Sequence, residues 1–461
     1  MSILAAFMVP HPPMIVPEVG RGSEKQVLET TLAYERVADE VAVLKPDTLI
    51  VTSPHAVMYA DYFHISPGRA ATGSFRQFRA PGVRFAEEYD TGLAKRICEL
   101  ADAEGFPAGT LGERDAALDH GTMVPLWFIR QKYAEGKIVR IGLSGLPLTD
   151  HYRLGQIIAQ AAENTGTRAV LIASGDLSHK LQEYGPYGFA PEGPEYDRRI
   201  MDVCGRAAFG ELLDFDETFC DRAAECGHRS FVIMAGAMDG LRVKARVLSH
   251  QDVTGVGYGI CTFYPEGADP DRHFLKAYQE KAERACHEQA EKSDPYVQLA
   301  RASVERWVRH RERISVPDGL LDEMLIRRAG TFVSLHRHGR LRGCIGTIMA
   351  TEKSVAAEII QNAVSACSRD PRFSPVTADE LSTLEISVDV LGELESIDSP
   401  EELDVKRYGV IVSHGRKRGL LLPNLDGVDT VEEQIRIARQ KGGIREGEPY
   451  RLERFEVVRH Y

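Results

Sequence analysis

Three apolar, β-rich segments of this sequence run into a histidine. AAFMVPHPP carries His11, LIVTSPHA carries His55 and LIASGDLSH carries His179. In an open α/β sheet, sites form in the crevice beyond the carboxyl ends of the strands. Buried imidazole needs a partner, and two imidazoles with one carboxylate or thiolate make an open transition-metal site. The pattern therefore indicates a metal centre with free positions for substrate and oxygen.

Two further segments offer side chains to such a site. AAECGHRS contains Glu225, which would complete a two-histidine-one-carboxylate site, and Cys226, which would make a softer one. LDHGTMVPLWF places His120, after Asp119, in a turn before an apolar helix. We expect His120 to line the site, and from the residues alone the choice between Glu225 and Cys226 stays open.

The elements that position these residues follow from the pattern of the first 264 residues. Short β-rich runs, such as SILAAFMV, DTLIVTS, VRIGLSGLPL, AVLIAS and GYGICTFY, alternate with helical segments. This alternation predicts an α/β domain over residues 1–264, with a buried central sheet flanked by helices.

The character of the sequence changes after residue 264. Residues 265–294 are charged and lack a wide apolar stripe, so we expect an exposed helical connector. Residues 295–461 begin with an amphipathic helical pattern and continue with several strand-like runs and few crossover helices. We expect a second, smaller α+β domain there.

Composition excludes some classes of protein. The 461 residues carry a net charge of −12, which does not suit nonspecific contact with nucleic-acid phosphates. No run of eighteen apolar residues occurs, so we expect no membrane span, and the apolar N-terminus reads as a buried strand. Eight scattered cysteines without a CxxC pair favour reduced thiols and a cytoplasmic location. The oligomeric state stays open, and a homo-oligomer is compatible with the sequence.

A second candidate site lies in LRGCIGT, residues 341–347. We expect this motif to form a turn between strands, where Gly343 leaves the thiol of Cys344 uncrowded. Arg342, two positions earlier, would lower the pKa of that thiol and stabilise the thiolate. A thiol enzyme centred on Cys344 is therefore one hypothesis for the function.

The first domain resembles a known family. HPP, SPHA, LDHGTMVPL, SGDLSH and GPYGFAPEGPEYD, in this order, look like the class III extradiol dioxygenase (LigB-like) superfamily and its Memo-like branch. The resemblance implies that His11 and His55 bind a non-haem Fe(II). It also implies that His179 acts as acid/base over a catechol-like substrate, that His120 contacts substrate or oxygen, and that Asp176 sits beside the metal.

The resemblance does not decide the identity of the third metal ligand, because the dioxygenases use a glutamate and Memo proteins use a cysteine. We prefer Glu225 to Cys226, since Fe(II) chemistry with oxygen favours a carboxylate. Another divalent metal, such as zinc, remains compatible with the site. Tyr187, in the glycine- and proline-rich segment after His179, is interpreted as a surface aromatic.

The second domain is similar to the AMMECR family. TFVSLHRHGRLRGCIGT, CSRDPRFSPVTADELSTLEISVDVL and GLLLPNL carry the similarity, and LRGCIG, with Arg342, Gly343 and Cys344, is its most specific element. Together the two domains resemble the AmmeMemoRadiSam set, which implies a radical SAM protein as a separate partner, because this chain has no CxxxCxxC motif. A metal-binding adaptor or sensor for that partner, without ring cleavage, is the alternative to an O2-using dioxygenase.

Overall fold

The computed structural model describes residues 2–112, 117–337, 340–425 and 427–461. The chain divides into two compact units, Met1–Tyr278 and Gln279–Tyr461. The division falls within α9 (Phe274–Lys292), inside the segment 265–294 that the sequence marks as a connector. The two units are described separately below.

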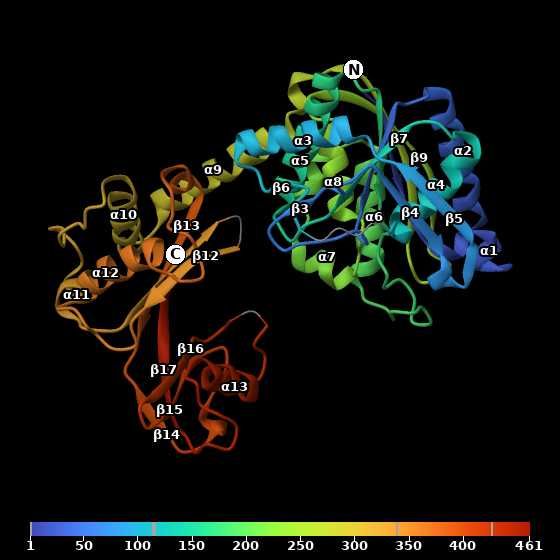
Figure 1. Cartoon of the computed structure of the whole chain (residues 1–461). Helices are drawn as coiled ribbons and strands as arrows, with labels where there is room; N and C mark the ends of the chain where they lie inside the picture. The colour runs from blue at the N-terminus through green and yellow to red at the C-terminus, as the bar shows by residue number, and fades with distance from the viewer. Residues whose placement is uncertain (1, 113–116, 338–339, 426) are drawn as a thin grey trace. The chain divides into compact units, whose positions relative to one another are not determined.

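A twisted sheet forms the centre of the first unit (Figure 1). Its strands run in the order β7 (Lys137–Gly142), β2 (Thr48–Ser53), β8 (Ala169–Ser174), β1 (Ile3–Val9), β10 (Tyr258–Ala268) and β9 (Leu241–Gln251). The first four strands are parallel, and β10 and β9 extend the sheet in antiparallel fashion. The carboxyl ends of β2, β8 and β1 therefore lie side by side at one edge of the sheet.

Helices cover both faces of this sheet. Alternate residues of β1 point to opposite faces, because side chains alternate along a strand. Phe7 belongs to the core on the face covered by α2 (Leu28–Leu44) and α4 (His120–Lys132). Met8 belongs to the core on the opposite face, which is covered by α3 (Thr91–Glu104), α5 (Leu148–Thr165), α6 (Glu192–Gly205) and α8 (His228–Ala237). Both residues are completely buried. The predicted α/β class with a helix-flanked central sheet is confirmed.

The remaining elements of the first unit are short or lie outside the sheet. They are α1 (Pro17–Gly20), β3 (Phe63–His64), β4 (Ala70–Phe75), β5 (Ala80–Glu88), β6 (Ala108–Gly109) and α7 (Glu217–Ala223). The sequence pattern did not predict the hairpin of β4 and β5 or the edge strand β9. The predicted strand in VRIGLSGLPL is too long, because β7 ends at Gly142 and α5 begins at Leu148.

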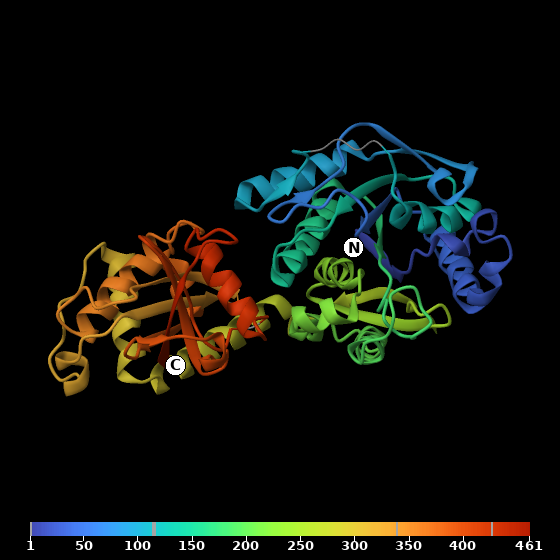
Figure 2. The same cartoon turned by 90° about the horizontal axis from the view of Figure 1, so that it is seen from below.

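The second unit is built on an antiparallel sheet (Figure 2). Its strand order is β12 (Arg340–Gly346), β11 (Thr331–Arg337), β13 (Leu384–Leu391), β17 (Arg451–His460), β15 (Tyr408–His414) and β16 (Lys417–Leu421), with β14 (Glu395–Ile397) also paired to β17. The helices are α10 (Pro295–His310), α11 (Asp322–Ile326), α12 (Val355–Ser368) and α13 (Val431–Lys441). The predicted smaller α+β domain is confirmed.

The LRGCIG motif is strand and not turn, which corrects the sequence-based expectation. Gly343 pairs with Leu335 and Cys344 with Ser334 in the ladder between β12 and β11. A Cβ at Gly343 would lie 2.4 Å from the carbonyl oxygen of Ala366 on α12. The glycine is therefore explained by the close approach of a helix to the strand and not by a turn.

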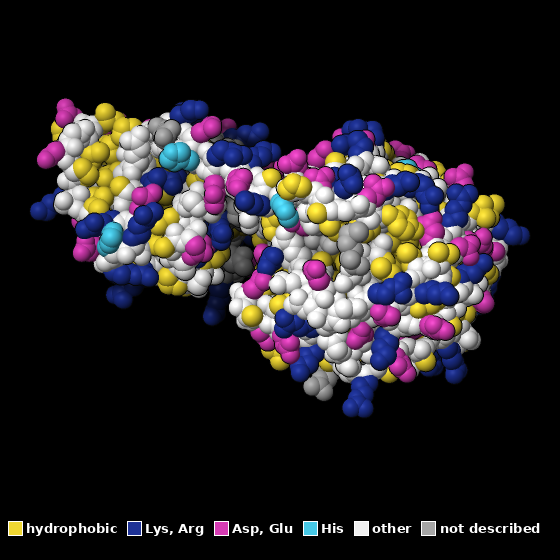
Figure 3. All heavy atoms as spheres, turned by 90° about the horizontal axis from the view of Figure 1, so that it is seen from above, with side chains coloured by type: hydrophobic (Ala, Val, Ile, Leu, Met, Phe, Trp, Pro, Cys, Tyr) yellow, Lys and Arg dark blue, Asp and Glu magenta, His cyan; other side chains and the backbone are white. Residues whose placement is uncertain are grey.

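The surface is mixed in charge. Figure 3 shows Lys and Arg side chains interspersed with Asp and Glu over the face in view. Within the described residues, no helix is long and apolar enough to cross a membrane. All eight cysteines lie in the described part of the chain, and none of them forms a disulfide.

Candidate metal centre

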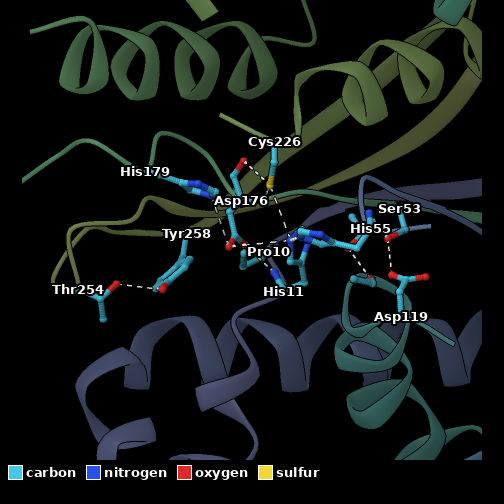
Figure 4. A network of polar contacts seen from close by, with 12 residues as sticks. Pro10, His11, Ser53, His55, Asp119, Asp176, His179, Cys226, Thr254 and Tyr258 are labelled. Atoms are coloured by element: carbon cyan, nitrogen blue, oxygen red, sulfur yellow. Dashed lines mark hydrogen bonds and ion pairs between the residues drawn. The ribbon is translucent and has the colours of Figure 1, made fainter. Parts of the chain in front are cut away.

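Strand ends bring the predicted histidines together. His11 follows β1, His55 follows β2, and Asp176 and His179 follow β8 (Figure 4). The ring centroids of His11 and His55 are 4.7 Å apart, and their planes are nearly perpendicular, at 87°. The Nε2 atoms of the two rings are 3.0 Å apart. Two imidazole nitrogens thus converge at the crevice beyond the sheet.

A serine fixes the tautomer of His11. Ser174, the last residue of β8, donates its hydroxyl hydrogen to the carbonyl of Gly121 at 2.6 Å. Its oxygen lies 3.0 Å from Nδ1 of His11, so it can only accept a hydrogen bond there. His11 therefore carries its proton on Nδ1, and the lone pair of Nε2 points toward His55. This is the arrangement of a metal-binding histidine held by an outer partner.

Cys226 supplies the third donor atom of this cluster. Its Sγ is 3.7 Å from Nε2 of His11, and the donor atoms of His11, His55 and Cys226 all lie within 4.8 Å of one another. Metal–nitrogen bonds of about 2.05 Å and a metal–sulfur bond of about 2.3 Å at tetrahedral angles imply N···N and N···S separations of about 3.3 and 3.6 Å. The observed 3.0 and 3.7 Å fit a single metal ion between these side chains.

Glu225, which the sequence analysis preferred as the third ligand, does not join the donor atoms of His11 and His55. Its carboxylate accepts a hydrogen bond from the backbone N–H of His228 at 2.6 Å, at the start of α8. Burial raises the pKa of Glu225 to about 7. Among the described residues, the groups able to hold a metal ion contain Cys226 and not Glu225. The geometry therefore favours the alternative, thiolate ligand.

Asp176 lies between the metal donors and His179. Its Oδ1 accepts the backbone N–H of His11 at 2.7 Å, and its Oδ2 is 4.0 Å from Nε2 of both His11 and His179. Asp176, His179 and Cys226 form a second group whose donor atoms lie within 4.8 Å of one another, so the two groups share the thiol. The ring of His179 stacks on Tyr187, with centroids 5.0 Å apart. Tyr187, interpreted from the sequence as a surface aromatic, is exposed but also covers His179.

His120 joins the cluster from the start of α4. Its ring centroid is 3.9 Å from that of His55 and 5.4 Å from that of His11. Asp119 caps α4 by accepting the N–H of Thr122 at 3.0 Å, and it also accepts the hydroxyl of Ser53 at 2.6 Å. Asp119 therefore links the start of α4, which carries His120, to the end of β2, which precedes His55.

Burial keeps these imidazoles neutral. It lowers the pKa of His11 and His55, and it lowers that of His120 to about 3, with a smaller contribution from His55. Burial also lowers the pKa of His179, which the nearby Asp176 partly offsets. Neutral imidazole is the form that binds a metal.

A cavity of about 1600 Å³ opens beside His55 and His120. The hairpin of β4 and β5 forms its other wall, with Arg76, Arg84 and Phe85 among the lining residues. The space adjoins the metal donors and can admit a small molecule.

Ser174, Ser53 and this hairpin were not predicted to serve the site. Ser174 lies in the SGDLSH stretch, and its position at the end of a strand could have identified it as a residue of the site. The hairpin of β4 and β5 could not be recognised in this way, because it lines the cavity and supplies no donor atom.

Arg342 does not act on Cys344 as the sequence suggested. Its guanidinium binds the carboxylate of Glu380, with contacts of 2.7 and 2.9 Å. Burial raises the pKa of the Cys344 thiol, and the cation that opposes this shift is Arg372. The expectation of an Arg342-stabilised thiolate is therefore wrong, because a carboxylate already engages that arginine.

The fold and the cluster define an α/β protein whose sheet carries, at its carboxyl edge, histidine and thiol side chains that could hold a metal ion. The family model described as "Catalytic LigB subunit of aromatic ring-opening dioxygenase" matches residues 5–261, and the AMMECR1 family model matches residues 297–460. The chain belongs to the LigB family and carries an AMMECR1 domain.

One relative matches the whole chain, and others match a part of it. A Clostridium acetobutylicum protein is 42% identical over 469 aligned positions, which cover 100% of this chain and 99% of that protein. A Thermotoga maritima protein is 48% identical over 168 residues, 36% of this chain and 97% of that protein. The crystal structure of a protein from Escherichia coli K12 matches 56% of this chain and 99% of its own chain, at 17% identity and a TM-score of 0.38.

Proposed function

We propose that the first unit is a non-haem, metal-dependent dioxygenase-like enzyme that opens the ring of a catechol-like substrate with O2. The observation that supports this most directly is the convergence of His11 and His55, whose Nε2 atoms are 3.0 Å apart at the strand ends, with His120 beside them. The proposed ligands are His11, His55 and Cys226, and Fe(II) is the proposed metal. When bound, Fe(II) supplies oxygen chemistry and a chelation point for two neighbouring hydroxyl oxygens.

The protein residues have distinct roles in this proposal. Ser174 holds the Nε2 lone pair of His11 toward the metal position. His179 takes the proton of a substrate hydroxyl and returns it to the ring-opened product. The carboxylate of Asp176, 4.0 Å from Nε2 of His179, favours the protonated form of that imidazole. His120 lies beside His55, and both line the cavity, where His120 contacts substrate or O2.

The test is metal content together with turnover. The full chain is purified without oxygen, loaded with Fe(II) and desalted, and its iron is measured for the wild type and His55→Ala. Both proteins are then mixed with catechol and substituted catechols in air, and ring-opened products are followed by absorbance. We expect close to one iron per chain and turnover in the wild type, and loss of both in the variant. Iron binding without turnover of any catechol would contradict the enzyme proposal.

A second candidate function is a metal-binding adaptor or sensor for a radical SAM protein. The observation that favours it is the thiol of Cys226 in the donor set, because thiolate ligands suit softer ions than an oxygen-activating carboxylate site does. Anaerobic pull-down with the full chain as bait tests it. Recovery of a radical SAM protein by the wild type supports the adaptor, and its absence counts against it.

A further inference from the structure

A cavity in the second unit is unrelated to the metal centre. Its volume is about 810 Å³, within the range of small-molecule sites. Its lining includes Leu341 and Cys344 of β12 and Arg418 and Leu420 of β16, although these strands are the two ends of the sheet order. The sheet is therefore coiled enough for both of its outer strands to face one space.

One part of the lining is apolar. It includes apolar side chains from β11, β12, β13, β16 and two loops. These are Phe332, Leu341, Ile348, Ile386, Leu420, Leu422 and Leu425. Removing apolar surface from water contributes about 25 cal/mol of favourable free energy per Å². The apolar part of the lining therefore suits the hydrocarbon body of a ligand.

The part of the cavity lining around Cys344 is positively charged. Arg372 donates to the carbonyl of Cys344 at 3.2 Å and pairs with Asp370 at 2.7 Å, so its charge is compensated. Lys441, at the end of α13, also lines the cavity, and its ammonium group makes no hydrogen bond or ion pair within the described part of the chain. One positive charge beside the thiol is thus left uncompensated.

The other charges of the lining act away from Lys441. Arg418 pairs with Glu453 at 2.8 Å and Arg459 with Asp389 at 2.7 Å. The acidic lining residue, Glu385, stands opposite His336, whose imidazole stays neutral because burial lowers its pKa. The groups that act on the charge of Lys441 are Cys344 and Arg372, and Glu385 is not one of them. A ligand that neutralises Lys441 needs a single negative charge.

We propose that this cavity binds a small organic monoanion, a molecule with one carboxylate and an apolar body. The carboxylate of this ligand lies against Lys441 and Arg372, and its apolar body covers the apolar part of the lining. The bound ligand therefore shields the thiol of Cys344 from solvent. The thiol remains protonated and is a neighbour of the ligand.

A matched pair of probes tests the charge requirement. 8-Anilinonaphthalene-1-sulfonate has an apolar body and one negative charge, and N-phenyl-1-naphthylamine has the same body without the charge. Both are titrated into the full chain and followed by fluorescence. Lys441→Gln is compared with Lys406→Gln, because both lysines are exposed and only Lys441 lines the cavity. We expect Lys441→Gln to weaken binding of the anionic probe at least about fivefold and to leave the neutral probe unchanged.

Alkylation of Cys344 locates the bound probe. Iodoacetamide labelling is followed at the level of individual peptides, with Cys98, a partly buried thiol of the first unit, as the internal control. We expect saturating anionic probe to slow labelling of Cys344 at least about fivefold and to leave Cys98 unchanged. Equal affinity of the wild type and Lys441→Gln for the anionic probe, or an unchanged labelling rate at Cys344, would overturn the proposal. Neither result bears on the metal centre.

Discussion

Gly175 and Gly227 meet backbone to backbone, so that a Cβ on Gly175 would lie 2.0 Å from the Cα of Gly227. Gly175 follows β8 and Gly227 precedes α8. This approach lets the N–H of Asp176 donate to Sγ of Cys226 at 3.3 Å, and the N–H of Cys226 donate to the carbonyl of Asp176 at 3.4 Å. The contact between two glycines therefore holds the thiol beside the strand-end histidines.

Replacing Gly175 by alanine should damage both the fold and the metal site. The added methyl group meets backbone that cannot rotate away, so we expect a loss of about 1–3 kcal/mol in the free energy of unfolding. Iron content should fall as well, because Cys226 moves with Gly227. The measurements are chemical denaturation and metal analysis. Gly82→Ala is the control, since a Cβ there meets nothing within 4 Å, and equal behaviour of the two variants would contradict this account.

Cys226→Ala and Glu225→Gln separate the two candidate third ligands. We expect Cys226→Ala to weaken iron binding at least about tenfold, because it removes a donor atom. Glu225→Gln should bind iron like the wild type, since its amide oxygen can still accept the N–H of His228. Competition with a chelator measures both affinities. Loss of iron in Glu225→Gln alone would restore the carboxylate as the ligand.

Ser174→Ala tests the tautomer of His11. Without the hydroxyl, Nδ1 of His11 loses the acceptor that fixes its proton, and we expect iron affinity to fall about 10–100-fold. The control is Ser249→Ala, because the hydroxyl of Ser249 is buried and has no hydrogen-bond partner among the described residues. A metal affinity unchanged in Ser174→Ala would mean that the serine plays no part in the site.

His179→Ala should separate proton transfer from metal binding. We expect iron content to stay close to that of the wild type and turnover of a catechol to fall about 10²–10⁴-fold, as for loss of a general acid/base. Turnover and iron are measured on the same preparation. A parallel loss of iron would instead make His179 a ligand, through the group it forms with Asp176 and Cys226.

His250 gives a pH dependence of stability away from the metal donors. Its Nε2 is 2.8 Å from Oδ2 of Asp197, and this hydrogen bond raises the pKa of His250, with Asp252 adding to the shift. A histidine whose pKa is raised by folding stabilises the protein below its unfolded pKa of about 6.5, and this stabilisation is lost as pH rises through the folded pKa.

The variant His250→Gln should therefore differ most from the wild type in acid. We expect its unfolding temperature to lie below that of the wild type at about pH 6 and to approach it at about pH 9. Thermal unfolding at both pH values measures this. His310→Gln, at an exposed position, is the control. A constant difference between His250→Gln and the wild type at both pH values would show that the contact contributes packing and not charge.

The sequence by itself determined the parallel strands of the first sheet and the histidines that follow them. Apolar runs such as AVLIAS end abruptly in polar residues, and strands that are parallel neighbours must bring those ends to one edge of the sheet. His11, His55 and His179 could be assigned to one site for this reason. The α/β and α+β character of the two parts followed from periodicity in the same way.

Only the tertiary structure distinguished neighbours along the chain. Glu225 and Cys226 are adjacent in sequence, and their roles depend on how Gly227 packs against Gly175, a contact between segments 52 residues apart in numbering. Arg342 lies two positions from Cys344, yet Glu380 engages its guanidinium. Sequence spacing sets which side chains can reach a point, but packing between distant segments sets their direction and their partners.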